Sequence, residues 1–204
     1  MNNKYIKIIL LIISLLIFGT ITILLLNGNI VKFDDYIFKH CVEGIRSNTL
    51  TNIFNFITFF SGVAFIIITT LLILFLTKNR IFATYMTLNV ILCFLMNQGL
   101  KLLFARPRPV DINLITESGY SYPSGHSMMS MAFYGLLIYF INRSKLGNWK
   151  KYILSILLSI LVLLIGFSRI YLGVHYASDV IAGFSLSFAY LIIFTSYINK
   201  KTSV

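Results

Sequence analysis

The chain has 204 residues, of which 58% are hydrophobic and only 11% are charged, and its mean hydropathy is +0.87. Because charged residues make up about a quarter of an ordinary soluble domain, this composition excludes that class and indicates an integral membrane protein. The net charge of +11 would also fit a nucleic-acid-binding protein, so the positions of the charges along the chain decide how it is interpreted.

Six stretches of the chain are apolar enough to cross a membrane. A spanning helix needs about 20 mostly apolar residues, because each backbone amide must be hydrogen-bonded within the segment when no water is present. The stretches cover residues 6–26, 53–77, 81–103, 127–141, 152–167 and 176–198, and the fourth and fifth are short enough to need flanking residues. The sequence therefore predicts an all-α, polytopic membrane protein in which residues 1–204 form one domain with six transmembrane helices in a single bundle.

The first stretch has one feature of a signal peptide, since Lys4 and Lys7 precede its apolar run. Its apolar core is longer than that of a signal peptide, and no cleavage site with small residues follows it. We therefore expect the first stretch to be a retained membrane anchor.

The segment that follows, FDDYIFKHCVEGIR, has the pattern of an amphipathic helix. Its charges fall on one side and its apolar residues on a stripe that consists of Phe33, Ile37, Phe38, Cys41, Val42 and Ile45. This pattern is typical of a helix that lies in the membrane interface. We predict a short interfacial helix in the first outward loop, and packing over the outer mouth of the bundle is favoured over direct contact with a ligand.

Charges are distributed unevenly between the two sides of the predicted spans. One side carries ten cations and no acidic residue, namely Lys4, Lys7, Lys78, Arg80, Arg143, Lys145, Lys150, Lys151, Lys200 and Lys201. The other side carries seven cations together with all six acidic residues. Because loops rich in Lys and Arg stay in the cytoplasm, both termini are predicted to be cytoplasmic and the mixed loops to face outward. The basic excess thus reflects topology, and no nucleic-acid partner is expected.

Ionisable residues from four predicted spans gather at the outward level. They are Lys101, Arg106 and Arg108 after the third span, His126 at the start of the fourth, Arg169 at the end of the fifth, and His175 and Asp179 at the start of the sixth. Ionisable residues at such depths are costly unless they interact with something, and they mark functional sites. A cluster dominated by cations predicts a binding site for an anion.

The segment YPSGH precedes the fourth predicted span. Ser124 is a favoured N-cap, and Gly125 permits close approach to the backbone. Free amides at such a helix start would point at an anion, assisted by the helix dipole. The segment alone would also fit a simple helix cap with an incidental histidine, but the cations in the neighbouring loops favour an anion site that includes His126.

His175 and Asp179 are four residues apart, so they share one face if the sixth helix includes both. A carboxylate that accepts one ring N–H fixes the imidazole tautomer and leaves the other nitrogen nucleophilic. The same pair would also fit a metal site. Lys101, Arg108 and Arg169 would repel a divalent cation and can themselves neutralise a phosphate, so we predict a nucleophilic histidine and no metal.

These residues resemble, in order and spacing, the three-part signature of the type 2 phosphatidic acid phosphatase (PAP2) superfamily. The signature positions are Lys101, Arg108 and Pro109, then Pro123, Ser124, Gly125 and His126, then Ser168, Arg169, His175 and Asp179. The motifs occupy residues 101–179, and the layout of six spans extends the resemblance to nearly the whole chain. The chain is similar in particular to the small bacterial membrane branch of this superfamily.

The resemblance implies a metal-independent phosphatase that forms a phosphohistidine and needs no cofactor. It implies that His175 attacks phosphorus, that Asp179 orients it, and that His126 protonates the departing oxygen and then activates water. The phosphate-binding residues that it implies are Lys101, Arg108, Ser124, Gly125 and Arg169. Spacing from the signature lysine selects Arg108 over Arg106, which is interpreted as an interfacial or supporting residue.

A site at the outer surface of the cell membrane favours a substrate whose hydrocarbon tail stays in the bilayer. Undecaprenyl diphosphate, phosphatidylglycerophosphate and phosphatidic acid all fit, with undecaprenyl diphosphate slightly ahead. The alternative is a transporter or flippase that binds a lipid phosphate without cleaving it. The set of His126, His175 and Asp179 favours the enzyme, because binding alone requires cations but no oriented nucleophile.

Overall fold

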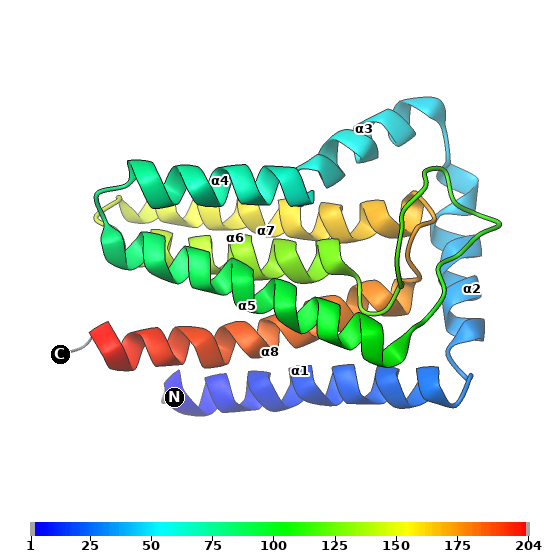
Figure 1. Cartoon of the computed structure of the whole chain (residues 1–204), viewed down its shortest axis with the longest axis horizontal. Helices are drawn as coiled ribbons and strands as arrows, with labels where there is room; N and C mark the ends of the chain where they lie inside the picture. The colour runs from blue at the N-terminus through cyan, green and yellow to red at the C-terminus, as the bar shows by residue number, and fades with distance from the viewer. Residues whose placement is uncertain (1–2, 203–204) are drawn as a thin grey trace.

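The computed structural model of the chain describes residues 3–202, and its regular elements over that range are all helical (Figure 1). They are α1 (Asn3–Leu26), α2 (Val31–Cys41), the 3-10 helix η1 (Glu43–Ile45), α3 (Asn48–Phe59), α4 (Val63–Leu76), α5 (Arg80–Phe104), α6 (Gly125–Arg143), α7 (Asn148–Tyr171) and α8 (Ala177–Thr202). The predicted all-α class is confirmed.

The long helices run back and forth between the two ends of one bundle, and α2 lies across one of these ends (Figure 1). We call this the α2 end. The loop between α5 and α6 and the turn between α7 and α8 lie at the same end. We call the opposite end, where Lys78, Arg143, Lys150 and Lys201 lie, the basic end. Segments far apart in the sequence thus meet beneath α2.

Five segments among residues 3–202 are long and apolar enough to cross a membrane: Lys4–Leu26, Asn48–Leu76, Arg80–Phe104, Asn148–Tyr171 and Ala177–Lys201. The chain is a multi-pass membrane protein, as predicted, but the six-span count is not confirmed because α6 is not among these segments. α6 packs against α5, α7 and α8 and buries polar residues such as Ser127 and Ser130. Since other helices surround it, its sequence does not need the hydropathy of a lipid-facing helix.

The second predicted span consists of two helices instead of one. α3 ends at Phe59 and α4 begins at Val63, and in the turn between them the amide of Gly62 donates to the carbonyl of Phe59 at 3.0 Å. The hydroxyl of Tyr134 on α6 donates to the carbonyl of Phe60 at 2.6 Å. A helix break inside a membrane protein is tolerated when such partners satisfy the freed backbone groups, and here a neighbouring helix supplies one.

α5 ends at Phe104, one residue beyond the predicted span of residues 81–103. Ala105 adopts a left-handed conformation with φ 45°, and its amide donates to the carbonyl of Lys101 at 2.9 Å. The two prolines that follow restrict the residues before them to extended geometry. The chain therefore leaves the membrane helix as an extended segment that presents Arg106 and Arg108 to the α2 end of the bundle.

Close approach of the backbone shapes the turn between α7 and α8. Gly173 has φ +70°, and a side-chain carbon placed there would lie 2.1 Å from the carbonyl oxygen of Ile112. The amide of Leu114 donates to the carbonyl of Leu172 at 2.8 Å. Glycine is thus required at this turn, and the turn is held against the loop between α5 and α6, which fixes the position of the residues that follow it.

Candidate active site

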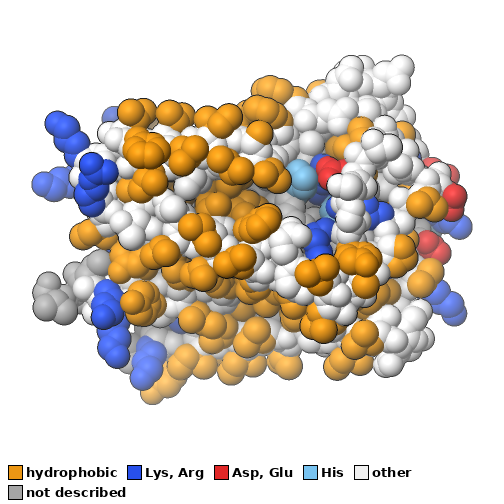
Figure 2. Space-filling view, in the orientation of Figure 1, with side chains coloured by type: hydrophobic (Ala, Val, Ile, Leu, Met, Phe, Trp, Pro, Cys, Tyr) orange, Lys and Arg blue, Asp and Glu red, His pale blue; other side chains and the backbone are white. Residues whose placement is uncertain are grey.

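All the predicted site residues lie at the α2 end. They are Lys101 on α5, Arg108 in the following loop, Ser124, Gly125 and His126 at the start of α6, Arg169 in the last turn of α7, His175 in the turn after α7 and Asp179 in the first turn of α8. On the face shown in Figure 2, histidine, acidic and basic side chains gather near this end of an otherwise apolar surface, whereas Lys and Arg side chains mark the basic end.

His175 and Asp179 lie side by side although they do not share a helix. α8 begins at Ala177, so His175 precedes the helix and Asp179 lies within it. Nδ1 of His175 lies 3.4 Å from Oδ2 of Asp179 and 3.2 Å from the hydroxyl oxygen of Ser121. Oδ2 of Asp179 also accepts hydrogen bonds from the hydroxyl of Ser121 and, at 3.0 Å, from the amide of Tyr176. Several donors therefore hold the buried carboxylate beside the imidazole.

Arg108 determines which nitrogen of His175 carries the proton. Nη1 of Arg108 lies 3.0 Å from Nε2 of His175, and a guanidinium can only donate hydrogen bonds. Nε2 is therefore the unprotonated acceptor, and the ring proton lies on Nδ1, which faces Asp179. Burial and the positive charges of Arg108, Arg169 and Lys101 lower the pKa of His175 well below its ordinary value of 6.5. The ring is thus neutral, with an electron pair at Nε2.

The guanidinium of Arg108 is held in place by backbone carbonyls from two segments. Its Nε donates to Gly119 at 3.0 Å and its Nη2 to Ser118 at 3.1 Å, both in the loop between α5 and α6. Its Nη1 donates to the carbonyl of Val174, next to His175, at 2.8 Å. These contacts keep a cation in front of Nε2 of the histidine.

Arg169 is fully buried, with 0% exposure. Its Nη2 donates to Oε1 of Glu117 at 2.5 Å and its Nη1 to the hydroxyl of Thr58 at 2.7 Å, while its Nε has no partner within the part of the chain that the structure describes. Oε2 of Glu117 also lies 4.0 Å from Nη2 of Arg108. One carboxylate of the protein thus lies between two arginines that are predicted to bind phosphate.

Lys101 and His126 add to this cluster. Nζ of Lys101, which is 9% exposed, donates to the carbonyl of Tyr120 and has two further donors. The half-buried His126 is close enough for electrostatic interaction with Lys101, Arg108, Arg169 and His175. Its ring makes no hydrogen bond to any residue between 3 and 202, so its nitrogens are available to a ligand.

The start of α6 has the predicted cap at Ser124, but the amide of Ser124 itself is not free to bind an anion. Ser124 is the N-cap, and its hydroxyl oxygen accepts a hydrogen bond from the amide of Ser127 at 3.4 Å. The amide of Ser124 donates to the carbonyl of Asp179 at 3.1 Å. The amides of Gly125 and His126 follow, and the first amides of a helix have no partner within it. They are therefore the donors that α6 offers to an anion.

Arg106 is interpreted from the sequence as an interfacial or supporting residue, but in the structure it contacts two buried carboxylates. It is 8% exposed, and its Nη1 lies 2.6 Å from Oδ1 of Asp179 while its Nη2 lies 2.7 Å from Oδ2 of Asp34. The guanidinium lies over the ring of Tyr176 at 3.9 Å from the ring centre. Arg106 thus connects α2 to the first turn of α8.

Sequence reasoning missed Asp34, the partner of Arg106 on α2. The helix itself was predicted, and its position across the end of the bundle agrees with a packing role. A signal for Asp34 was present, because it lies three, four and seven residues before Ile37, Phe38 and Cys41 and so shares their apolar stripe. A charge on a packing face requires a partner, and the structure supplies one.

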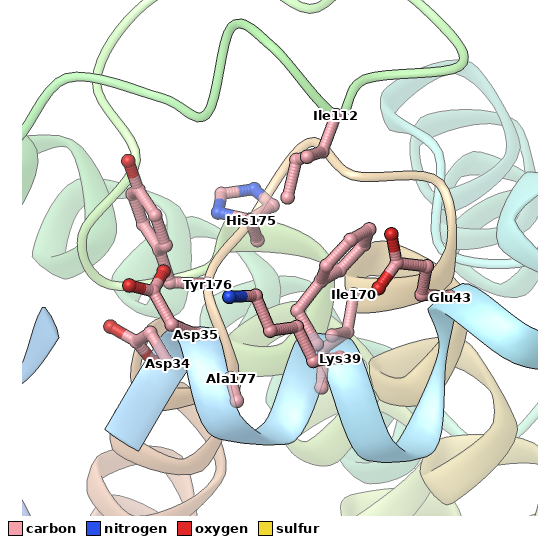
Figure 3. Close-up of a pocket in the computed structure, with 10 residues that line it drawn as sticks. Asp34, Asp35, Lys39, Glu43, Ile112, Ile170, His175, Tyr176 and Ala177 are labelled. Atoms are coloured by element: carbon pink, nitrogen blue, oxygen red, sulfur yellow. The ribbon is translucent and has the colours of Figure 1, made fainter. Parts of the chain in front are cut away.

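A pocket of about 190 Å³ lies between α2 and the turn that carries His175 (Figure 3). Its lining consists of Asp34, Asp35, Phe38, Lys39, Glu43, Ile112, Ile170, His175, Tyr176 and Ala177. In Figure 3, Asp35 and Lys39 extend from α2 on the near side and His175 lies behind them. α2 therefore forms one wall of a pocket that reaches the histidine.

The sequence matches the PAP2 superfamily over residues 80–203. It is also 32% identical over 182 residues to phosphatidylglycerophosphatase B of Bacillus subtilis, a similarity that covers 85% of this chain and 88% of that protein. The chain belongs to the PAP2 superfamily. Its identity to the undecaprenyl-diphosphatase of Sulfolobus acidocaldarius is 31% over 125 residues, which covers 58% of this chain and 56% of that protein.

A solved structure extends the similarity to the fold of nearly the whole chain. It is the crystal structure of a transmembrane PAP2-type phosphatidylglycerolphosphate phosphatase from Bacillus subtilis, with 27% identity, a TM-score of 0.83 and coverage of 97% of each chain. The predicted resemblance to this superfamily is confirmed, and so is the predicted class of enzyme, a membrane lipid phosphatase or diphosphatase. Within residues 3–202, no group of three or more His, Cys, Asp or Glu side chains is arranged to hold a metal ion.

Proposed function

We propose that this PAP2 phosphatase removes phosphate from a membrane lipid through a phosphohistidine on His175. The observation that carries the proposal is the 3.0 Å contact between Nη1 of Arg108 and Nε2 of His175. It requires a neutral imidazole whose electron pair faces a cation, while the protonated nitrogen faces Asp179. Attack on phosphorus needs such an electron pair together with cations that bind the phosphate oxygens.

In the first step, the electron pair on Nε2 of His175 forms the N–P bond while the bond between phosphorus and the leaving oxygen breaks. Asp179 accepts a hydrogen bond from Nδ1 and stabilises the positive charge that develops on the ring. The negative charge of the bound phosphate favours the protonated form of His126. His126 then gives its proton to the leaving oxygen, so the lipid product departs without an unfavourable charge.

In the second step, His126 accepts a proton from a water molecule whose oxygen forms a new bond to phosphorus. The N–P bond breaks and its electron pair returns to Nε2 of His175. Inorganic phosphate leaves, and both histidines regain their starting protonation states. Neither step requires a metal ion or a cofactor.

Three cations are proposed to bind the phosphate oxygens: Lys101, Arg108 and Arg169. The buried Nε of Arg169 lacks a partner among the described residues, and an unpaired buried donor is uncommon unless a ligand completes it. Nη2 of the same arginine donates a hydrogen bond to Oε1 of Glu117. We propose that the substrate phosphate displaces this carboxylate when it binds.

The start of α6 is proposed to supply two further donors, the amides of Gly125 and His126. Helix N-termini bind phosphate because their amides are free and the helix dipole is positive there. Ser124 contributes indirectly, since its hydroxyl caps the helix and its amide is already bonded to the carbonyl of Asp179.

We propose that α6 crosses the membrane as a sixth span in addition to the five segments that qualify by composition. It runs between the same two ends as its neighbours (Figure 1). The absence of acidic residues from the loops of the basic end favours a cytoplasmic position for that end. The active site then faces outward, where the phosphate of an outer-leaflet lipid reaches the site while its tail stays in the bilayer.

Cys41 offers a direct test of this orientation, because it is exposed at the α2 end while Cys93 is buried. A membrane-impermeant maleimide should label the protein in intact cells, and Cys41→Ser should abolish the labelling. A cysteine placed at exposed Lys145 in that background should react only after the cells are opened. The reverse pattern would place the active site in the cytoplasm.

Undecaprenyl diphosphate and phosphatidylglycerophosphate are the substrates that we propose first, because they correspond to the names of two relatives. Phosphatidic acid is the third. Purified protein should release phosphate from at least one of them in the presence of EDTA, and His175→Ala should release none. Turnover by His175→Ala would exclude the phosphohistidine. Transport of a labelled lipid without any phosphate release would instead favour a flippase.

A further inference from the structure

α2 lies outside the residues that match the superfamily, 80–203, yet it places a buried carboxylate next to Arg106 and the start of α8. Asp34 is 3% exposed, whereas its neighbour Asp35 is exposed. Oδ1 of Asp34 accepts the amide of Ser178 at 2.8 Å, and Oδ2 accepts the hydroxyl of Ser178 at 2.8 Å and Nη2 of Arg106 at 2.7 Å. Three donors therefore hold this carboxylate against the start of α8.

Arg106 connects this carboxylate to the one beside the nucleophile. Its Nη1 donates to Oδ1 of Asp179 at 2.6 Å and to the hydroxyl oxygen of Ser178 at 2.8 Å. The other oxygen of Asp179 lies 3.4 Å from Nδ1 of His175. A continuous and buried series of contacts thus runs from α2 to the imidazole through Asp34, Arg106, Asp179 and His175.

We infer that Asp34 is a positioning residue for the reaction: through Arg106 it holds Asp179 in the orientation that fixes the tautomer and direction of His175. This inference rests on the proposed function of the same site. Asp34 does not line the cluster of phosphate-binding cations, and its effect on the chemistry passes through two other side chains. α2 is then part of the catalytic scaffold as well as a cover over the bundle.

The geometry of Arg106 explains how one carboxylate can orient another. A guanidinium is planar, so a carboxylate bound at Nη2 fixes the direction in which Nη1 points. The ring of Tyr176, 3.9 Å from the guanidinium carbon, restricts the tilt of the same plane. Without Asp34, Arg106 is free to rotate toward Asp179 and to compete with His175 for its oxygens.

The balance of charge leads to the same expectation. Asp34, Arg106 and Asp179 together carry a net charge of −1, which favours the cationic ring that forms when His175 binds phosphorus. If Asp34 loses its charge, Arg106 neutralises Asp179 alone and the group carries no net charge. The imidazole then loses both its fixed partner and the negative charge that stabilises the intermediate.

A purely structural role must be separated from positioning, because Asp34 also caps α8 through the amide of Ser178. Loss of a cap lowers stability but leaves the imidazole tautomer as it is. A positioning role changes the imidazole in the folded protein. The state of the ring of His175 therefore distinguishes the two roles.

The first experiment observes this ring without any substrate. The sequence has three histidines, so long-range ¹⁵N–¹H spectra of the full chain in detergent micelles contain three ring systems, which His40→Gln and His126→Gln assign. Asp34→Asn should shift both ring nitrogens of His175 toward a mixture of tautomers, and the matched control Asp111→Asn, which removes an exposed acid from the loop between α5 and α6, should leave them unchanged. Identical His175 spectra for the two variants would overturn the inference.

The second experiment measures hydrolysis of undecaprenyl diphosphate and of dioctanoyl phosphatidic acid. For Asp34→Asn we expect kcat to fall about 10- to 100-fold with KM within about twofold, as for other residues that orient the partner of a reacting group. Asp111→Asn should match the wild type. A change in KM alone would overturn the inference. If the wild type releases no phosphate, the proposed function fails, while the spectra still decide whether Asp34 orients His175.

A second variant covers the case in which Asp34→Asn does not fold. Ser178→Ala removes the hydroxyl that donates to Asp34 and accepts from Arg106, but it keeps both carboxylates and the amide cap. We expect a smaller shift of the His175 ring signals in the same direction. An unchanged His175 spectrum in folded Ser178→Ala would count against the inference.

Discussion

Both ends of the bundle carry cations, but they hold them in different ways. At the α2 end, Arg106 and Arg169 are no more than 8% exposed, and each lies within hydrogen-bonding distance of a carboxylate. At the basic end, Lys145 and Lys150 are exposed, and the loops there contain no acidic residue. Figure 2 shows the contrast, with mixed charges near one end and cations at the other.

The difference separates two uses of positive charge in a membrane protein. A buried cation is costly unless its partners are arranged around it, so its position is fixed by the fold. An exposed cation near a membrane surface interacts mainly with water and with the electrostatic bias that sets topology. Substitutions of the buried cations at the α2 end should therefore change catalysis or folding, and substitutions of the exposed cations at the basic end should change neither in purified protein.

Arg108 and Arg106 should give the largest effects, of two different kinds. Arg108→Ala removes a cation from the front of His175 and should lower kcat by about 100- to 1,000-fold, as for other lost donors to a developing charge. Arg106→Ala leaves Asp34 and Asp179 buried without their cation and should destabilise the fold by about 3–5 kcal/mol. Turnover and thermal unfolding of both variants in detergent provide the measurement.

The outcome also tests the sequence-based choice between the two arginines. If Arg106→Ala folds normally and weakens inhibition by inorganic phosphate more than Arg108→Ala does, then Arg106, and not Arg108, binds the phosphate. Arg106→Lys is the matched control, because it keeps one charge but cannot bind two carboxylates with a planar fork.

The low pKa of His175 should appear in the pH dependence of kcat/KM. Burial and the charges of Arg108, Arg169 and Lys101 hold this pKa well below 6.5. The attacking electron pair is lost only when the ring is protonated, so the acidic fall in kcat/KM that belongs to this group should lie below pH 6.5. Arg108→Gln removes one positive charge, so the pKa should rise and the acidic fall should move to higher pH.

A comparison at constant substrate isolates this effect, because a phosphate group itself titrates at about pH 6. The same lipid should therefore be used for the wild type and for Arg108→Gln. A shift to lower pH in the variant would show that the fall in rate does not report His175.

Glu117→Gln should give a smaller effect on phosphate binding. Oε1 of Glu117 lies 2.5 Å from Nη2 of Arg169, and the side chain of Glu117 is 28% exposed. Because a bound phosphate would contact the same arginine, the carboxylate competes with it. We expect inorganic phosphate to inhibit the variant about two- to fivefold more strongly, the range that corresponds to a partly exposed ion pair. Inhibition constants measured beside Asp111→Asn, which removes an exposed acid from the same loop, provide the check. Weaker inhibition would mean that Glu117 helps to hold Arg169 for phosphate.

The basic end should show the smallest effect. Lys145→Gln combined with Lys150→Gln changes two exposed side chains, so stability should change by no more than about 0.5 kcal/mol per site. Phosphate release by the purified variant should equal that of the wild type. A clear loss of turnover in detergent would contradict the contrast between the two ends.

Local sequence patterns predicted much of this molecule. The cap at Ser124, the end of the third predicted span near residue 103 and the helical class depend on neighbouring residues, and the structure contains them. The fixed spacing of the three motifs likewise identified residues that the fold brings together, because each motif lies at the end of a helix and these ends share one level of the bundle.

Contacts between distant segments were not predictable in the same way. Asp34 and Arg106 are separated by 72 residues, and no local spacing relates them. The break between α3 and α4 depends on Tyr134 of another helix, while the apolar pattern runs through it. The failure of α6 to qualify as a span by composition has a similar cause, since neighbouring helices define its surroundings.

The enclosed position of α6 has a consequence for how the protein is made. A new segment partitions into lipid according to its own hydropathy, and α6, with buried Ser127 and Ser130 near its start, is not among the segments that qualify as spans by composition. α7 and α8, its packing partners, are synthesised after it. If α6 is the sixth span that we propose, we expect it to be stably inserted only after these later helices are made. Because His126 lies in the first turn of α6, the active site would then be completed late in the biogenesis of the protein.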